Sequence, residues 1–415
     1  MNAKDVLSDA QNRIRDNRTT EVTLRVVDKN GNPVGNAAAD VKLTNHAFKF
    51  GCNGFGIRSI TSADLQAAYE TRFSALLNYA TLPFYWGSYE PAQGQTREAH
   101  LHTMAAWCAE QKITTKGHPL IWHEVFPQWA QKLSDDMVFD LLERRARTIP
   151  AQFKGQVDIW DVVNEATVSH RFDNAVGRWS TRDGAATLVE KALRWAHEAN
   201  PEATLLYNDF NIAPAFERLV ADLLDRDAPV DVIGIQSHMH QGTWSLERAW
   251  TVCETYARFG LPLHFTELTV LSGRLKPKDE TDWHKRHTDW ISTPEGESAQ
   301  AEYGEQLYTL LFSHPAVGAI TWWDFADYDA WQGAPAGFLR TDMSPKPLHD
   351  RLMALVHGEW RTDVQTATDA QGLTRCRCFF GEHTVTVTLA SGDVMRGTFS
   401  LNRGDKNPVA VIVQT

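Results

Sequence analysis

Eight apolar, strand-like stretches recur between residues 48 and 327, and helical patterns lie between most of them. They are FKFGCN (48–53), YATLPFYW (79–86), TTKGHPLIWH (114–123), DIWDVVNEA (158–166), TLLYNDF (204–210), DVIGIQSHM (231–239), LPLHFTELT (261–269) and AITWWDFAD (319–327). Such alternation of strand and helix predicts a (β/α)8 barrel, in which the carboxyl ends of the strands form the active face. Polar residues end nearly every stretch, so we expect a functional site at that face.

The two flanks show a different pattern of short strands and turns. Residues 21–47 surround an Asn-Gly turn, and residues 358–415 show no helical periodicity. A lone hairpin is marginally stable in water, so two separate edge hairpins are the less favoured alternative. We expect the two segments to form one small β-sandwich, similar to bacterial carbohydrate-associated modules, with the barrel (48–357) inserted into it. Residues 1–20 are polar and predict a helical segment.

Composition restricts the partners. The formal net charge is −11, with 41 basic and 52 acidic residues. Nucleic acid and anionic membranes need clustered Lys and Arg, so we expect neither as a partner. The chain has no apolar signal core and no segment that could span a bilayer. We therefore expect a soluble protein, either cytoplasmic or secreted with its signal peptide removed.

The sequence predicts no cofactor, no metal and no required disulfide. The 5 cysteines are odd in number and show no CxxC or metal-binding spacing. Cys376 and Cys378 lie two apart on a predicted strand and so share one face, a poor arrangement for a mutual bridge. A phosphate-binding glycine loop, a dinucleotide fingerprint and a nucleophilic Ser or Cys motif are all missing.

Two carboxylic acids stand near the ends of strands. Glu165 follows Asn164 after the fourth stretch, and Glu267 lies at the end of the seventh. A single Glu in such a place is often paired structurally with a neighbouring strand. Two of them, in a barrel mouth rich in Trp, His and Asn, can cleave a glycoside if one is protonated and the other ionised. Their environments must then separate their pKa values.

Seven motifs in register carry a family resemblance. They are SYEPAQG (88–94), KGHPLIWH (116–123), WDVVNEA (160–166), LLYNDFN (205–211), IQSHMH (235–240), FTEL (265–268) and WWDFADYDAW (322–331). Together the sequence resembles glycoside hydrolase family 10, the endo-β-1,4-xylanase family, from about residue 48 to 357. The resemblance implies a retaining mechanism on an oligo- or polysaccharide or a glycoside.

The resemblance also implies roles for individual residues. Glu165 falls where the family keeps its acid/base and Glu267 where it keeps its nucleophile. The retaining mechanism predicts that their carboxyl groups lie about 5–5.5 Å apart. The predicted substrate-binding residues surround the cleaved sugar or its neighbour: His118, Trp122, Asn164, Asn208, Gln236, His238, Trp323, Trp331, Trp86 and Tyr85.

Several positions depart from the family pattern. Thr81, Leu82 and Tyr85 stand where the family usually has Glu, Asn and Lys, and Val125 stands where it has Gln. These positions hold the second sugar on the non-reducing side. Thr269 replaces a carboxylate that would orient a histidine. We therefore expect a β-linked glycan other than ordinary xylan, or a glycoside with a bulky aglycone.

Three alternatives stay open from the sequence. The chain could be a conventional endo-β-1,4-xylanase. It could be a non-catalytic glycan-binding protein on a barrel scaffold, although both carboxylic acids are present. It could also be a metal-dependent hydrolase that uses histidines such as His118, His123, His238 and His240, although no matching Asp/His cluster appears at the first or eighth stretch.

Overall fold

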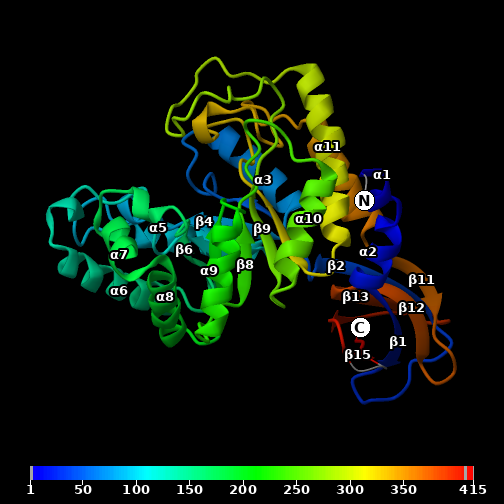
Figure 1. Ribbon diagram of the computed structural model, residues 1–415. Coiled ribbons are helices and arrows are strands. Elements are labelled where there is room, and N and C mark those ends of the chain that lie inside the picture. Colours follow the sequence, from blue (N-terminus) through cyan, green and yellow to red (C-terminus); the bar gives the residue numbers. More distant parts are fainter. Residues whose placement is uncertain (1–2, 406–408, 415) are drawn as a thin grey trace. The chain divides into compact units, whose positions relative to one another are not determined.

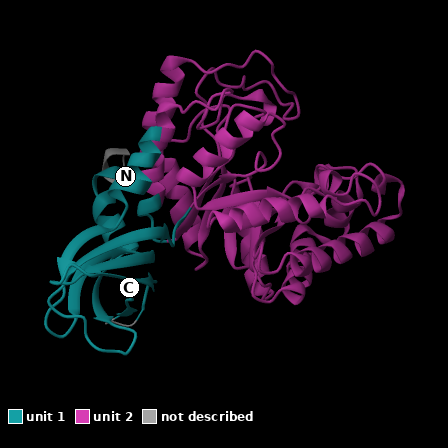
Figure 2. Cartoon of the chain, turned by 180° about the vertical axis from the view of Figure 1, so that it is seen from behind, with its two compact units in different colours: residues 1–49, 312–315, 350–415 teal, residues 50–311, 316–349 magenta. Residues whose placement is uncertain are grey.

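The computed structural model describes residues 3–405 and 409–414. Residues 1–2, 406–408 and 415 belong to the predicted N-terminal helical segment and C-terminal strand segment, and they lie outside the described residues. The chain forms two compact units (Figure 2). One contains residues 50–311 and 316–349, and the other contains residues 1–49, 312–315 and 350–415. Among the described helices, none has the length and apolar composition that crossing a membrane requires.

The larger unit is built around a closed barrel of parallel strands (Figure 1). The strands follow one another in chain order, and β10 closes the barrel against β3. They are β3 (Lys49–Asn53), β4 (Tyr79–Pro83), β5 (Thr114–His118), β6 (Ile159–Asn164), β7 (Thr204–Asp209), β8 (Val232–Ile235), β9 (Leu263–Leu268) and β10 (Val317–Trp322). Each overlaps one predicted apolar stretch. Every residue of β6 and β9 is buried, as expected for strands covered on both faces.

Helices separate the barrel strands, and α12 (Pro347–Ala354) follows the last of them. The separating helices are α3 (Ala63–Leu76), α4 (Trp86–Tyr89), α5 (Glu98–Glu110), α6 (Asp135–Gln152), α7 (Ala175–Asp183), α8 (Ala185–Ala199), α9 (Pro214–Asp225), α10 (Leu246–Ala257) and α11 (Pro294–Ser313). Short helical turns occur at Ala130–Lys132, Ser169–Arg171, Trp331–Gly333 and Leu355–Glu359. Ser134 and Ser245 cap α6 and α10 by accepting hydrogen bonds from backbone N–H groups of the first turn.

The smaller unit contains two sheets. One has the order β12-β1-β15 and the other β11-β2-β13-β14. The strands are β1 (Thr19–Val27), β2 (Ala38–His46), β11 (Asp363–Ala367), β12 (Leu373–Phe379), β13 (Gly381–Thr388), β14 (Val394–Leu401) and β15 (Val409–Ile412). Two helices, α1 (Ala3–Ser8) and α2 (Ala10–Arg18), precede β1.

Each N-terminal strand of this unit pairs with C-terminal strands. β1 runs antiparallel to β12 and parallel to β15, while β2 runs antiparallel to β11 and β13. The Asn-Gly turn is present, and an isolated bridge between Val27 and Pro33 flanks it, but β1 and β2 enter different sheets. The predicted fold class, a (β/α)8 barrel with a small sandwich built from both termini, is therefore confirmed.

Alternating side chains from both sheets form the core of the sandwich. From β1 it includes Val22, Leu24 and Val26, and from the other sheet Val41 and Val385. The five cysteines are free and buried, and two of them, on β12, belong to this core. The unit thus needs strands from both ends of the sequence to bury its apolar faces.

We expect Leu24→Ala to destabilise the sandwich, because Leu24 is fully buried and its truncation leaves a cavity that costs about 2–5 kcal/mol. Arg25→Ala, one residue on and exposed, is the control and should change the free energy of unfolding by less than about 0.5 kcal/mol. Chemical denaturation followed by circular dichroism measures both. Equal effects of the two substitutions would contradict the two-sheet core.

Candidate active site

Polar side chains meet at the carboxyl ends of the barrel strands. His118 ends β5, Asn164 ends β6, and Gln236 follows β8. Asn208 and Glu267 are the next-to-last residues of β7 and β9. Because all strands of the barrel are parallel, these ends open at the same rim.

Three amides link the two carboxyl groups. Asn208 Nδ2 donates to Glu267 Oε1 at 2.7 Å and to Asn164 Oδ1 at 2.8 Å. Gln236 Nε2 donates to Asn164 Oδ1 at 3.1 Å and to Glu165 Oε1 at 2.8 Å. A continuous chain of hydrogen bonds therefore runs from Glu165 to Glu267, and it fixes both side chains relative to each other.

Glu165 lies just past the end of β6, with its backbone in the left-handed region at φ 59°. Its Oε1 also accepts a hydrogen bond from Asn164, and its Oε2 accepts one from the indole N–H of Trp122 at 3.1 Å. Burial raises the pKa of Glu165 well above 4.5 despite the hydrogen bond from Gln236, and the charge of Glu267 raises it further. The carboxyl group of Glu165 is therefore held in its protonated form.

Glu267 has the opposite electrostatic setting. It is 3% exposed, and burial alone would raise its pKa. The nearby His118, the hydrogen bond and charge of His238, and the charge of Lys116 outweigh burial, so the pKa lies below 4.5. Imidazole Nε2 of His238 lies 3.0 Å from Glu267 Oε2. The Glu267 carboxyl group is therefore held as a carboxylate.

A buried ion pair lies beneath these groups. Asp161, within β6, is 2.5 Å from the ammonium of Lys116 and 2.7 Å from Nδ1 of His118. Burial opposes ionisation of Asp161, but both partners lower its pKa. Sequence reasoning missed Asp161 and Lys116. The available signal was a charged residue in the middle of each otherwise buried strand.

Two threonine side chains at the end of β9 contact the Asn208 amide and the His238 ring. The Thr266 hydroxyl donates to Asn208 Oδ1 at 2.6 Å, which sets the amide so that Nδ2 faces Asn164 and Glu267. Thr269 Oγ1 lies 2.9 Å from Nδ1 of His238. The hydroxyl of Thr269 thus contacts the ring from the position where the resemblance places a carboxylate.

Aromatic rings line the site. Trp323 lies edge-on to His118 and His238, at centroid distances of 5.5 and 5.8 Å. Tyr85 lies 5.2 Å from His118 and 5.5 Å from Trp122. These contacts bring the predicted residues Trp122, Tyr85 and Trp323 together with the carboxyl groups.

The other two predicted aromatic residues, Trp331 and Trp86, lie in different surroundings. Trp331 packs 4.8 Å from His238, and its backbone N–H donates to Asp324 Oδ1 at 3.0 Å. Trp86 instead donates its indole N–H to Glu90 and packs on Phe126 and Trp129. The contacts of Trp86 place it with structural neighbours, away from the hydrogen-bond network, so we retain Trp86 as a substrate-binding residue only as a prediction.

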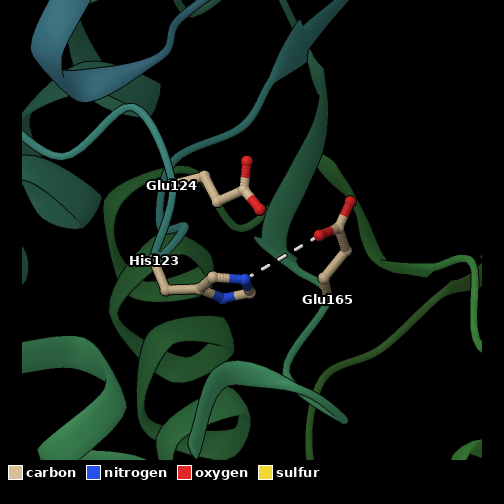
Figure 3. Close-up of side chains that lie close together, drawn as sticks. All are labelled: His123, Glu124 and Glu165. Carbon is tan, nitrogen blue, oxygen red and sulfur yellow. Dashed lines mark ion pairs between the residues drawn. The ribbon is translucent and has the colours of Figure 1, made fainter. Parts of the chain in front are cut away.

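Two of the histidines singled out for a metal site, His238 and His240, have ring centroids 5.6 Å apart, but among the described residues they belong to no group of three metal-binding side chains. Both ring nitrogens of His238 already contact Glu267 and Thr269, and His240 is enclosed by rings that include Trp283 and Trp331. Within the described part of the chain, the one group with metal-binding geometry is His123, Glu124 and Glu165, shown in Figure 3.

A parallel barrel with two buried carboxyl groups of opposite pKa shift at its mouth is the arrangement expected of a barrel glycoside hydrolase. The sequence profile described as "Glycosyl hydrolase family 10" matches residues 48–354, so the chain belongs to this family. The resemblance seen in the sequence motifs is thereby confirmed, and family membership supports a glycoside hydrolase.

Known proteins extend this comparison. The Endo-1,4-beta-xylanase B of Thermotoga neapolitana is 28% identical over 257 residues, covering 59% of this chain and 68% of that protein. The Anti-sigma-I factor RsgI6 of Acetivibrio thermocellus is 26% identical over 96% of this chain, which spans only 49% of that protein. The structure of xylanase 10B from Thermotoga petrophila RKU-1 in complex with xylobiose matches with a TM-score of 0.63 and 24% identity. The match covers 75% of this chain and 95% of that one, and it shows that the two share a fold.

Proposed function

We propose that the chain is a retaining β-glycoside hydrolase in which Glu267 is the nucleophile and Glu165 the general acid and base. The observation that carries this proposal is the divergence of the two pKa values within one hydrogen-bond network. A carboxylate with a lowered pKa can attack an anomeric carbon, and a carboxyl group with a raised pKa can donate a proton to the leaving oxygen. The expected separation of the two groups stays a prediction.

Glu267 and Glu165 take part in both steps of the proposed reaction. In the first step the Glu267 carboxylate bonds to the anomeric carbon, the glycosidic C–O bond breaks, and the proton of Glu165 passes to the departing oxygen. In the second step Glu165, now ionised, takes a proton from water, whose oxygen displaces Glu267 from the sugar. His238 and Asn208 hold one oxygen each of Glu267, so its orientation toward the sugar is fixed before substrate binds.

The substrate is a β-linked glycan or glycoside, and the residues at the positions that hold the second sugar argue against ordinary xylan. Leu82 is fully buried and apolar, Tyr85 packs against other rings, and Val125 projects from a left-handed backbone with 42% exposure. None of these side chains can supply the hydrogen bonds of Asn, Lys or Gln. Apolar faces at these positions suit a ring or an apolar substituent.

Conventional xylanase activity and glycan binding without cleavage are the competing functions. The relatives include xylanases and an anti-sigma factor, so both alternatives need a direct test. Two buried carboxyl groups are costly to keep in a site that only binds neutral sugars. Their retention favours catalysis.

We expect Glu267→Ala to abolish turnover of every β-glycoside, because no group remains to form the glycosyl intermediate. Glu165→Ala should retain the first step on aryl glycosides with good leaving groups, which need little protonation, and lose about 10²–10⁴-fold on unactivated glycosides. Stopped-flow release of the aryl alcohol measures both steps. Glu98→Gln, on α5, is the control and should behave as the parent protein.

The same assignments fix the form of the pH profile of kcat/KM. Glu267 must be ionised, and its pKa is lowered, so the acid limb should lie below pH 4.5. Glu165 must be protonated, and its pKa is raised, so the alkaline limb should lie well above pH 4.5. Initial rates on an aryl β-glycoside across the pH range measure both limbs. Loss of the alkaline limb in Glu165→Gln supports the assignment, whereas its persistence contradicts it.

We expect weak activity on unsubstituted β-1,4-xylan and higher activity on another β-glycoside. Each missing partner of a buried sugar hydroxyl costs about 1–3 kcal/mol, so three could lower kcat/KM roughly a thousandfold if they add. The triple variant Leu82→Asn, Tyr85→Lys, Val125→Gln should recover part of the activity on xylan. A glycan panel with product analysis tests this. Efficient release of xylobiose and xylotriose by the parent protein would refute it and leave the catalytic roles intact.

A further inference from the structure

Two side chains beside Glu165, those of His123 and Glu124, have no role in the proposed reaction. His123 and Glu124 follow β5, and Glu165 follows β6. Each offers one ligand atom, and the three atoms lie within 4.8 Å of one another. Nε2 of His123 is 3.8 Å from Oε2 of Glu165, and the three side chains turn toward a common space (Figure 3).

The imidazole of His123 is buried without a hydrogen bond. It is 2% exposed, and neither ring nitrogen has a hydrogen-bond partner. Its ring packs 4.0 Å from the ring of Phe172. Buried polar side chains are nearly always satisfied, so an orphaned imidazole aimed at a carboxyl group indicates a further ligand.

The donor set matches a transition metal. One imidazole nitrogen and two carboxylate oxygens are the protein ligands of a common type of three-ligand zinc site, which keeps a fourth position open for water. Glu165 would release its proton on binding the ion, and the two carboxylates would then balance the charge of a divalent ion. Bonds of about 2.0–2.2 Å require the ligand atoms to approach one another. Glu124 can make that movement, because it is half-buried and its ion pair, 3.4 Å long, is with the exposed side chain of His284.

We propose that His123, Glu124 and Glu165 bind a divalent transition-metal ion such as Zn²⁺, and that the bound ion inhibits hydrolysis. Inhibition rests on the proposed function of Glu165, whereas binding does not. A metal bound to Glu165 would prevent its carboxyl group from carrying the catalytic proton, and on Oε2 it would compete with the hydrogen bond from Trp122. Mg²⁺ should act poorly here, because it prefers six oxygen ligands and keeps several waters.

Zinc binding and inhibition are measured on the same EDTA-treated full-length chain. Calorimetry with ZnCl2 gives the affinity, and hydrolysis of an aryl β-glycoside at rising ZnCl2 gives the inhibition. Glu124→Gln should weaken both by at least about tenfold, since even indirect supporting residues of metal sites cost 10–100-fold when lost. Glu98→Gln is the matched control, because Glu98 also pairs with a histidine, His102, at 3.5 Å. It should change neither value.

Separate outcomes judge the two halves of the proposal. Unchanged zinc affinity in Glu124→Gln, or in Glu165→Gln, would overturn the site. Zinc binding that depends on Glu124 but leaves hydrolysis intact would overturn the inhibition. Equal inhibition by MgCl2 would overturn the transition-metal assignment. Calorimetry still tests the site if the chain hydrolyses none of the glycosides tried. A failure of the proposed function can therefore be distinguished from a failure of the metal site.

Discussion

The hydrogen bonds that Asn208 and Gln236 make to Glu267 and Glu165 are the constraint on which the site depends. Two carboxyl groups buried in one barrel mouth repel each other if both ionise, so a proton must stay on one of them. Amide N–H groups satisfy both side chains but do not decide which one keeps it. Lys116, His118 and His238 act on Glu267 and lower its pKa, whereas burial raises the pKa of Glu165, and this asymmetry favours the proton on Glu165.

That asymmetry continues into the strands below. Asp161 holds Lys116 and His118 on β5, and both contribute to lowering the pKa of Glu267. A buried ion pair is a poor source of stability, because desolvation offsets much of the attraction. Its value here is positional, since it fixes a positive charge on one side of the mouth. The barrel therefore supplies the electrostatic field as well as the geometry.

The sequence predicted the barrel well because most of the strand stretches are apolar and helical patterns lie between most of them, so local patterns agree with the final structure. Glu165 and Glu267 were predictable because parallel strands must end at one rim. Asp161 and Lys116 were missed, since a charge inside a strand is interpretable only once its partner on the neighbouring strand is known. For Trp86 the sequence suggested substrate binding, whereas in the structure its indole packs on Phe126 and Trp129, two rings that follow β5 in the chain.

A change of substrate is compatible with the proposed cleavage because the residues concerned lie on different strands. Glu165, Asn208, Gln236 and Glu267 are carried by β6 to β9 and the residues that follow them, whereas Leu82 lies on β4. A hydrogen bond lost at β4 leaves the network between the two carboxyl groups complete. Substitutions at such positions can therefore alter which glycoside binds without altering how its bond is cleaved, and the barrel permits this because each strand contributes its end residues separately.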